Sequence, residues 1–258
     1  MTRWAVSFRQ GAQLLVVLLA AFTLKQYYST ASVNELRWVL APTASLVQMI
    51  TGERFTFEPY AGYMSADLSF LIAQSCSGVN FLISAFLLLA LGKLWRCRRQ
   101  KVGWGFIPFA AVAAYLSTIA ANTARIATAL HLREMDTDWI WLNPDQLHRF
   151  EGIVVYFGCL MLLFAASQRL NDRKQERDLT VKGLLRRALL PLAVYYAITL
   201  GVPVVTGIYR GSTIEGFWEH SLFVLLTPVA ILLPVVAFRA VREHRLFRSD
   251  SPVLTEKY

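Results

Sequence analysis

Six long apolar runs constrain the fold of this 258-residue chain more than any other feature. Each holds about 18 or more mostly apolar residues, the length that an α-helix needs to cross about 30 Å of hydrocarbon. Only 17% of all residues are charged, which argues against an ordinary soluble domain. The sequence therefore predicts an all-α polytopic membrane protein with about six transmembrane helices, organised as a single integral membrane domain over residues 1–258. The runs cover residues 11–28, 78–95, 104–130, 150–168, 188–208 and 217–238.

The segment between the first two runs, residues 29–77, does not read as a clean span. Its apolar part carries Arg37 and is interrupted by Pro42. Proline favours the first turn of a helix and glycine the position after the last, so Pro42 predicts the start of a short interfacial helix and Gly52 its end. The alternating sequence RFTFEPYAGY at 54–63 predicts a hairpin-like surface segment. We expect residues 29–77 to connect the two spans at the outer face.

Basic residues are distributed unequally between the two sides of the predicted spans. Nineteen of the 26 Lys and Arg residues fall before the first span, in the loops 93–101 and 169–187, and in the tail 239–258. Because cytoplasmic loops carry an excess of Lys and Arg, both termini are predicted to be cytoplasmic, and the tail is predicted to be a cytoplasmic basic tail. The charge is scattered over short loops, which indicates the lipid bilayer rather than nucleic acid as the partner. The sequence makes no prediction of oligomeric state.

This orientation places three reactive residues at one depth in the membrane. Cys76 precedes the cytoplasmic Lys93 by about 17 residues, which is about 25 Å of helix and reaches the outer face. Arg125 follows Lys101 by about 24 residues in apolar, helical sequence, and His148 stands just before the next span. The sequence thus predicts that Cys76, Arg125 and His148 converge near the outer face.

These three residue types form a chemically competent set. A cysteine thiolate is a strong nucleophile, and a neighbouring cation favours that form. His148 can transfer protons, and Arg125 can stabilise the oxyanion of a tetrahedral intermediate. An arginine within a membrane helix is costly unless it faces a polar cavity or a partner. Asn122, one turn earlier on the same helix face, can orient Arg125, and Gly78 lets a substrate backbone approach Cys76.

Each of these residues also has a simpler interpretation. A cysteine near a membrane helix usually serves only packing, and Cys97 and Cys159 are read in that way. Arg125 can extend to the interface, and His131 and His220 compete with His148 as outer-side bases. The three cysteines make no metal-ligand spacing, and neither a metal nor a cofactor is expected. Two other classes of function stay open: a small transporter in which Arg125 binds an anion, and a non-catalytic scaffold for surface-polymer assembly.

Three motifs in this order resemble the exosortase/archaeosortase family of prokaryotic membrane enzymes. The family has a Cys-Ser-Gly motif, a later Asn-x-x-Arg within a membrane helix, and His-x-x-x-Gly at the start of the next span. The matching residues here are Cys76-Ser77-Gly78, Asn122 through Arg125, and His148 through Gly152. The resemblance covers roughly residues 36–165. The sequence departs from the family pattern at Val79-Asn80-Phe81, where many members carry an arginine soon after the glycine. In this respect the sequence looks like the branch called exosortase K.

The resemblance implies a membrane cysteine protease/transpeptidase with Cys76 as nucleophile, Arg125 as transition-state stabiliser and His148 as acid/base. Ser77, Gly78, Asn122 and Gly152 are implied as supporting residues. The substrate would be a membrane-anchored protein with a C-terminal signal consisting of a short motif, a membrane helix and a basic cluster. Cleavage would release this tail, and the new C-terminus would pass to an acceptor at the surface of a prokaryotic cytoplasmic membrane.

Overall fold

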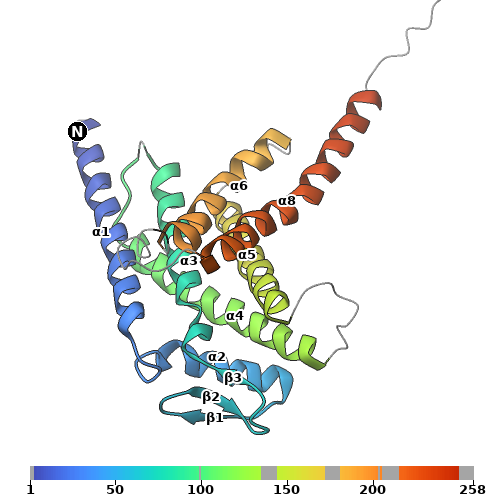
Figure 1. Cartoon of the computed structure of the whole chain (residues 1–258). Helices are drawn as coiled ribbons and strands as arrows, with labels where there is room; N and C mark the ends of the chain where they lie inside the picture. The colour runs from blue at the N-terminus through green and yellow to red at the C-terminus, as the bar shows by residue number, and fades with distance from the viewer. Residues whose placement is uncertain are drawn as a thin grey trace, which may run out of the picture.

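A computed structural model describes residues 3–98, 100–134, 144–171, 181–202, 204 and 215–249. Within them lie seven α-helices and one small antiparallel sheet (Figure 1). The helices are α1 (Arg3–Thr30), α2 (Arg37–Thr51), α3 (Val79–Arg96), α4 (Phe106–Glu134), α5 (Pro144–Asn171), α6 (Val181–Tyr196) and α8 (Glu215–Ser249). The strands are β1 (Phe55–Glu58), β2 (Gly62–Ser65) and β3 (Leu71–Ile72). A short 3-10 helix, η1 (Gln74–Ser77), precedes α3, and a π-helical segment, η2 (Ala197–Gly201), follows α6.

The prediction of a polytopic helical membrane protein is confirmed. Five helical segments are long and apolar enough to cross a membrane, and a sixth apolar helix is shorter. The long segments are Phe8–Thr30, Gln74–Arg96, Phe106–Arg133, Arg149–Leu170 and Val224–Val241, and the shorter one is Ala188–Gly201. Each corresponds to one of the six apolar runs of the sequence.

Helix α3 forms the centre of the bundle. It packs against α1, α4, α5 and α6, and 72% of its spanning segment is buried, against 17% for α1. The exposed faces of the surrounding helices carry large apolar side chains, among them Leu15, Phe22, Phe109 and Leu116. Because lipid tails are as apolar as these side chains, this distribution suits a membrane bundle.

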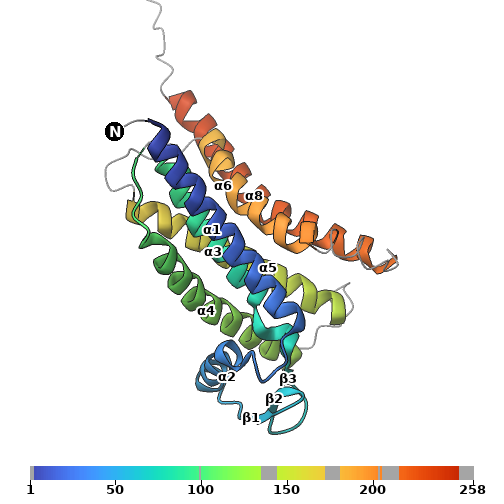
Figure 2. The ribbon, with the colours of Figure 1, turned by 90° about the vertical axis from the view of Figure 1, so that its left-hand side faces the viewer.

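Helix α2 and the sheet lie together at one end of the bundle (Figures 1 and 2). The N-terminal end of α1 and the C-terminal end of α8 both lie at the opposite end (Figures 1 and 2). The side chain of Gln10 donates to the carbonyl oxygens of Cys97 and Gln100 at 2.8 and 3.0 Å, which ties the start of α1 to the loop after α3. The ends of α3 therefore face two different regions: η1 and the sheet at one, and the N-terminal part of the chain at the other.

The predicted hairpin is confirmed, with one addition. β1 and β2 pair antiparallel through Phe55 opposite Ser65, and the chain turns between them at Glu58 to Gly62. β3, which the alternation did not reveal, pairs with β2 and leads directly into η1. The sheet therefore delivers the chain to Cys76.

Helix α2 ends at Gly52 as predicted, but it begins earlier than the sequence indicated. Gly52 adopts a left-handed conformation with φ of 76° and donates its N–H to the carbonyl of Gln48. The helix starts at Arg37, so Pro42 lies inside it rather than at its start. Proline removes the hydrogen bond to the carbonyl four residues earlier, which here belongs to Trp38. The hydroxyl of Tyr115 on α4 donates to that carbonyl at 2.7 Å, and this bond allows the helix to contain a proline.

Candidate active site

Cys76 lies in η1, between the sheet and the first turn of α3. Its thiol is free and its side chain is partly buried. Its backbone N–H donates to the carbonyl of Ala73 at 2.9 Å, and its carbonyl accepts a hydrogen bond from Nδ2 of Asn122 at 2.5 Å. A side chain of α4, 46 residues away in the sequence, therefore helps to fix the turn that carries the thiol.

Gly78 allows α4 to approach this turn closely. Its φ is +69°, a left-handed conformation that favours glycine. A Cβ at this position would lie 3.2 Å from Cγ of Asn122 and 3.3 Å from Cγ2 of Thr118. Ser77 beside it is fully buried, and its hydroxyl has no hydrogen-bond partner within the described part of the chain. In the structure, the absence of a side chain at Gly78 thus makes room for the side chain of Asn122.

The Asn122 side chain uses both ends of its amide. Nδ2 donates to the carbonyl of Cys76, and Oδ1 accepts a hydrogen bond of 2.7 Å from the hydroxyl of Tyr156 on α5. Asn122 is fully buried. A buried amide is stable only when its polar atoms are paired, so these two bonds define its orientation.

Arg125 lies against Gly152, where α4 and α5 meet. A Cβ on Gly152 would lie 2.9 Å from Nε of Arg125, so the glycine leaves the space that the guanidinium occupies. Nη1 of Arg125 donates a long hydrogen bond of 3.5 Å to the hydroxyl of Tyr156, and Cζ lies 5.4 Å from the centre of that ring. Cys76 and Glu151 are also near enough to interact with the guanidinium electrostatically. The structure thus brings Cys76, Asn122, Arg125 and Gly152 together.

His148 belongs to the first turns of α5, one helical turn before Gly152. Its backbone is part of that helix, but its side chain lies outside the described residues, as does that of His220. His131 is exposed near the end of α4. The catalytic role of His148 stays a prediction, supported by its place on the stripe of α5 that also contains Gly152.

The model of the family described as Transmembrane exosortase (Exosortase_EpsH) matches residues 2–165. The chain belongs to the exosortase family. Its matched region includes all three motifs that the resemblance rested on. No curated protein and no solved structure matches the chain.

Membership of the exosortase family implies a membrane transpeptidase role in the processing of C-terminal sorting signals. Family members are generally considered membrane cysteine proteases/transpeptidases. Across the described residues, no group of three or more His, Cys, Asp or Glu side chains is placed to hold a metal ion.

Two further residues at the candidate site were not predicted from the sequence. Tyr156 and Glu151 both lie on α5, and Glu151 is 5% exposed. Along α5, Tyr156 follows Gly152 by one helical turn and His148 by two. That spacing was available in the sequence, but spacing alone does not show which face of α4 these residues meet.

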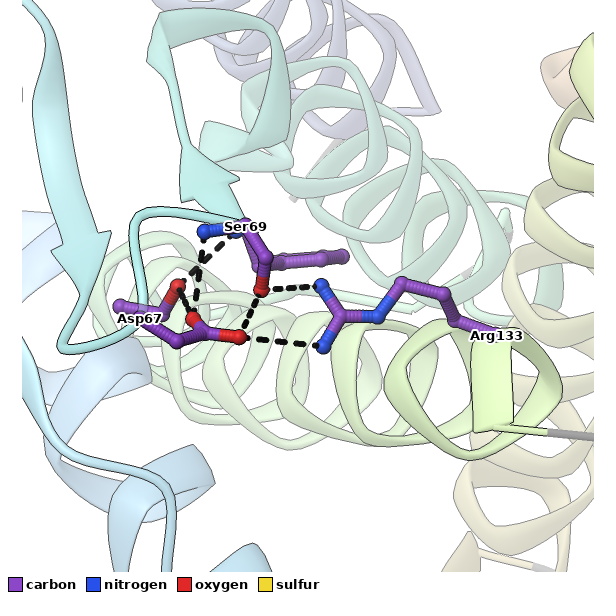
Figure 3. Close-up of polar contacts among 5 residues, drawn as sticks. Asp67, Ser69 and Arg133 are labelled. Atoms are coloured by element: carbon purple, nitrogen blue, oxygen red, sulfur yellow. Dashed lines mark hydrogen bonds and ion pairs between the residues drawn. The ribbon is translucent and has the colours of Figure 1, made fainter.

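A second polar network ties the end of α4 to the turn between β2 and β3 (Figure 3). Nη1 of Arg133 donates to the Ser69 hydroxyl at 2.6 Å, and Nη2 lies 3.8 Å from Oδ2 of Asp67. The Ser65 hydroxyl donates to Oδ1 of Asp67 at 2.6 Å. Hydrogen bonds from Ser65 and Ser69, with a smaller effect of Arg133, lower the pKa of Asp67 from its ordinary value of 3.8 to about 2. We call these four residues the outer clip.

Helix α1 and the residue that follows it, Ala31, contact the segment that carries Cys76 at two positions. Nε2 of Gln74 donates to the carbonyl of Ala31 at 2.9 Å. Nζ of Lys25 donates to Oδ1 of Asn80 at 2.8 Å. The segment from Gln74 to Asn80 is thus held from one side by α1 and from the other by α4, so the position of the thiol is determined by two neighbouring helices.

Proposed function

We propose that this chain is a membrane-embedded cysteine protease/transpeptidase that cleaves C-terminal sorting signals through a thioester on Cys76. One observation carries the proposal: the hydrogen bond from Asn122 to the carbonyl of Cys76. It joins the Cys-Ser-Gly motif to the Asn-x-x-Arg motif, which the family match alone leaves unconnected in space. The contact of Arg125 with Gly152 adds the third motif to the same site.

The reaction begins when the Cys76 thiolate attacks the scissile carbonyl carbon of the substrate. A carbon–sulfur bond forms, and the negative charge on the carbonyl oxygen faces the Arg125 guanidinium, a fixed cationic donor. The carbon–nitrogen bond then breaks, and His148 gives a proton to the leaving amine. An acceptor amine or water loses its proton to His148 and attacks the thioester carbonyl carbon. The carbon–sulfur bond then breaks, which restores the Cys76 thiolate and the protonated His148 with which the cycle began. Transfer and hydrolysis differ only in this last nucleophile.

The substrate in this proposal is a membrane-anchored protein with a tail composed of a motif, a helix and a basic cluster. The basic loops of the enzyme suit a substrate helix that enters sideways from the lipid with its own basic cluster in the cytoplasm. We place the chain in an exosortase K-like branch because of Val79 and Asn80. In the structure, Asn80 accepts a hydrogen bond from Lys25.

The proposed topology places the active site at the outer face of a prokaryotic cytoplasmic membrane, with both termini in the cytoplasm. Residues 1–258 form one membrane domain, residues 29–77 lie outside, and the tail 239–258 lies inside. Cys76 and Cys97 flank α3, whose 18 residues span about 27 Å. A membrane-impermeant maleimide added to intact cells should label the protein when Cys76 is its only cysteine. It should not label a variant whose only cysteine is Cys97, and the reverse pattern would contradict this orientation.

The function is tested by co-expression with a reporter library. Each reporter is a folded marker protein followed by a varied motif, an apolar helix of about 20 residues and a basic cluster. We expect the wild type to shorten some reporters, and Cys76→Ala and Cys76→Ser to reduce the rate by about a thousandfold or more, as loss of a nucleophile does. Cys97→Ala and Cys159→Ala are the matched controls and should process normally. Processing that survives both Cys76 variants would contradict the proposal and favour a transporter or scaffold.

A further inference from the structure

The hydroxyl of Tyr156 stands between the two residues that the Asn-x-x-Arg motif contributes. It donates to Oδ1 of Asn122 at 2.7 Å and accepts from Nη1 of Arg125 at 3.5 Å. Because a tyrosine hydroxyl has one proton, the proton given to Asn122 leaves only oxygen lone pairs for Arg125. The bonds therefore run in one direction, from Arg125 to Tyr156, then to Asn122 and to the carbonyl of Cys76.

The ring of Tyr156 holds this hydroxyl in place. It stacks on Phe81 of α3 with ring centres 5.3 Å apart and planes 29° apart. The Arg125 guanidinium lies over the same ring, with Cζ 5.4 Å from its centre. Contacts from α3 and α4 on an aromatic ring of α5 restrict its rotation, so the hydroxyl is a fixed reference point for both polar partners.

We propose that Tyr156 is a positioning residue of the active site, which sets the orientation of the Asn122 amide and of the Arg125 guanidinium. This inference rests on the proposed function, because it assigns Tyr156 to the thioester chemistry at Cys76. Tyr156 touches neither the thiol nor the substrate in this account. It acts through Asn122 on the turn that carries Cys76, and through Arg125 on the charge that develops at the substrate carbonyl.

Loss of the hydroxyl changes both bonds at once. In Tyr156→Phe the ring and its stacking remain, but Oδ1 of Asn122 loses the Tyr156 donor and Nη1 of Arg125 loses the Tyr156 acceptor. The amide can then rotate, so that Nδ2 no longer faces the carbonyl of Cys76. Since neither change removes a contact with the substrate, the maximal rate should fall while the Michaelis constant stays nearly constant.

Tyr115→Phe provides a matched control on α4. It also removes a tyrosine hydroxyl that bonds a partner on another helix, the carbonyl of Trp38 at 2.7 Å. It lies outside the chain of bonds from Arg125 to Cys76. Any loss of activity that follows merely from a weaker bundle should therefore appear equally in Tyr115→Phe.

The experiment uses the purified full-length enzyme and one reporter from the library that the wild type cuts. We expect Tyr156→Phe to lower kcat about fivefold, the effect of a lost neutral hydrogen bond, with KM within twofold of the wild type. Tyr115→Phe should leave both constants within twofold at a similar melting temperature. Because Tyr156 acts in part through Asn122, Tyr156→Phe should cost less kcat in an Asn122→Ala background than in the wild type.

Two results would overturn the inference. If Tyr156→Phe and Tyr115→Phe lower kcat equally, Tyr156 only supports the bundle. If Tyr156→Phe raises KM with kcat unchanged, it contributes to substrate binding instead. Both outcomes leave the Cys76-dependent cleavage intact, so they contradict the role of Tyr156 alone. If Cys76→Ala cuts the same reporter as fast as the wild type, the proposed function fails and the role of Tyr156 fails with it.

Discussion

Arg125 and Arg133 lie on the same helix, eight residues apart, in two different environments. Arg125 is largely enclosed by protein between α4 and α5, with a tyrosine hydroxyl, an aromatic ring and Cys76 around it. Arg133 lies at the end of the helix with 41% of its side chain exposed, opposite an Asp67 that is 53% exposed. A guanidinium inside a membrane helix costs several kcal/mol, whereas an exposed ion pair contributes little to stability.

The two environments indicate different roles: Arg125 in the reaction, and Arg133 in holding the sheet against α4. A costly charge persists only where its surroundings compensate for it, and Arg125 is surrounded by the residues of the family motifs. The outer clip of Arg133 instead binds the turn between β2 and β3 to α4, and so orients the sheet that leads into Cys76. We therefore expect substitutions at Arg125 to change the reaction and substitutions at Arg133 to change only the surface.

The largest expected contrast is between Arg125→Lys and Arg133→Lys. Lysine keeps the charge but lacks the planar fork of donors. We expect Arg125→Lys to lower reporter processing by about 100-fold or more, as removal of an oxyanion donor does, and Arg133→Lys to leave it within twofold. The measurement is the rate of reporter shortening in cells, with expression levels matched. Equal effects of the two variants would remove the distinction drawn above.

A smaller contrast separates Gly152 from Gly158 on α5. A methyl group on Gly152 would stand 2.9 Å from Nε of Arg125, while one on Gly158 would meet nothing within 4 Å. Gly152→Ala therefore has to displace the guanidinium, and a shift of about 1 Å in a catalytic group costs up to about 100-fold in rate. We expect about a tenfold loss of kcat for Gly152→Ala and none for Gly158→Ala. Full activity of Gly152→Ala would show that the position of Arg125 has no importance for the reaction.

The smallest expected effect concerns the outer clip, and it is a change in melting temperature that depends on pH. The pKa of Asp67 is lowered from 3.8 to about 2 in the folded protein. A carboxyl whose pKa is lower when folded stabilises the protein above its unfolded pKa, and this contribution is lost as the pH falls through the folded pKa. Asp67→Asn should therefore melt slightly below the wild type from pH 5 to pH 8, and the difference should disappear as the pH falls from about 4 to about 2.

Glu58→Gln is the control for this titration, because it removes an exposed carboxylate next to the other turn of the sheet. Thermal unfolding in detergent over the same pH range measures both variants. A difference for Asp67→Asn that persists below pH 2, or that grows as the pH falls, would mean that the carboxylate bonds of the outer clip do not stabilise the fold.

The sequence was sufficient to predict the membrane-spanning segments, because apolar length alone decides which segments can cross a membrane. It also predicted that Cys76 and Arg125 lie at one depth, from the direction that the basic loops predict for each span. In the structure, Asn122, one helical turn before Arg125, bonds the carbonyl of Cys76. It did not predict the start of α2, because the bond from Tyr115 that accommodates Pro42 comes from a distant helix. Strand β3, with two residues, is too short to produce an alternating pattern.

Tyr156 was missed for a different reason. Its role depends on the rotation of α5 against α4, which sets its hydroxyl between Asn122 and Arg125. Periodicity places residues on a face of their own helix, but it does not say which face of the next helix they meet. The catalytic roles of Cys76, Arg125 and His148 stay predictions.

The central claim is that Cys76 carries the substrate as a thioester, and trapping that intermediate tests it most directly. Hydroxylamine added to the purified enzyme and a cleaved reporter should attack the thioester, so that mass spectrometry finds a hydroxamate at the new C-terminus of the marker protein. We predict this product with the wild type and none with Cys76→Ala. Cleavage by the wild type that yields only a carboxylate in excess hydroxylamine, or a hydroxamate formed equally by Cys76→Ala, would contradict the account.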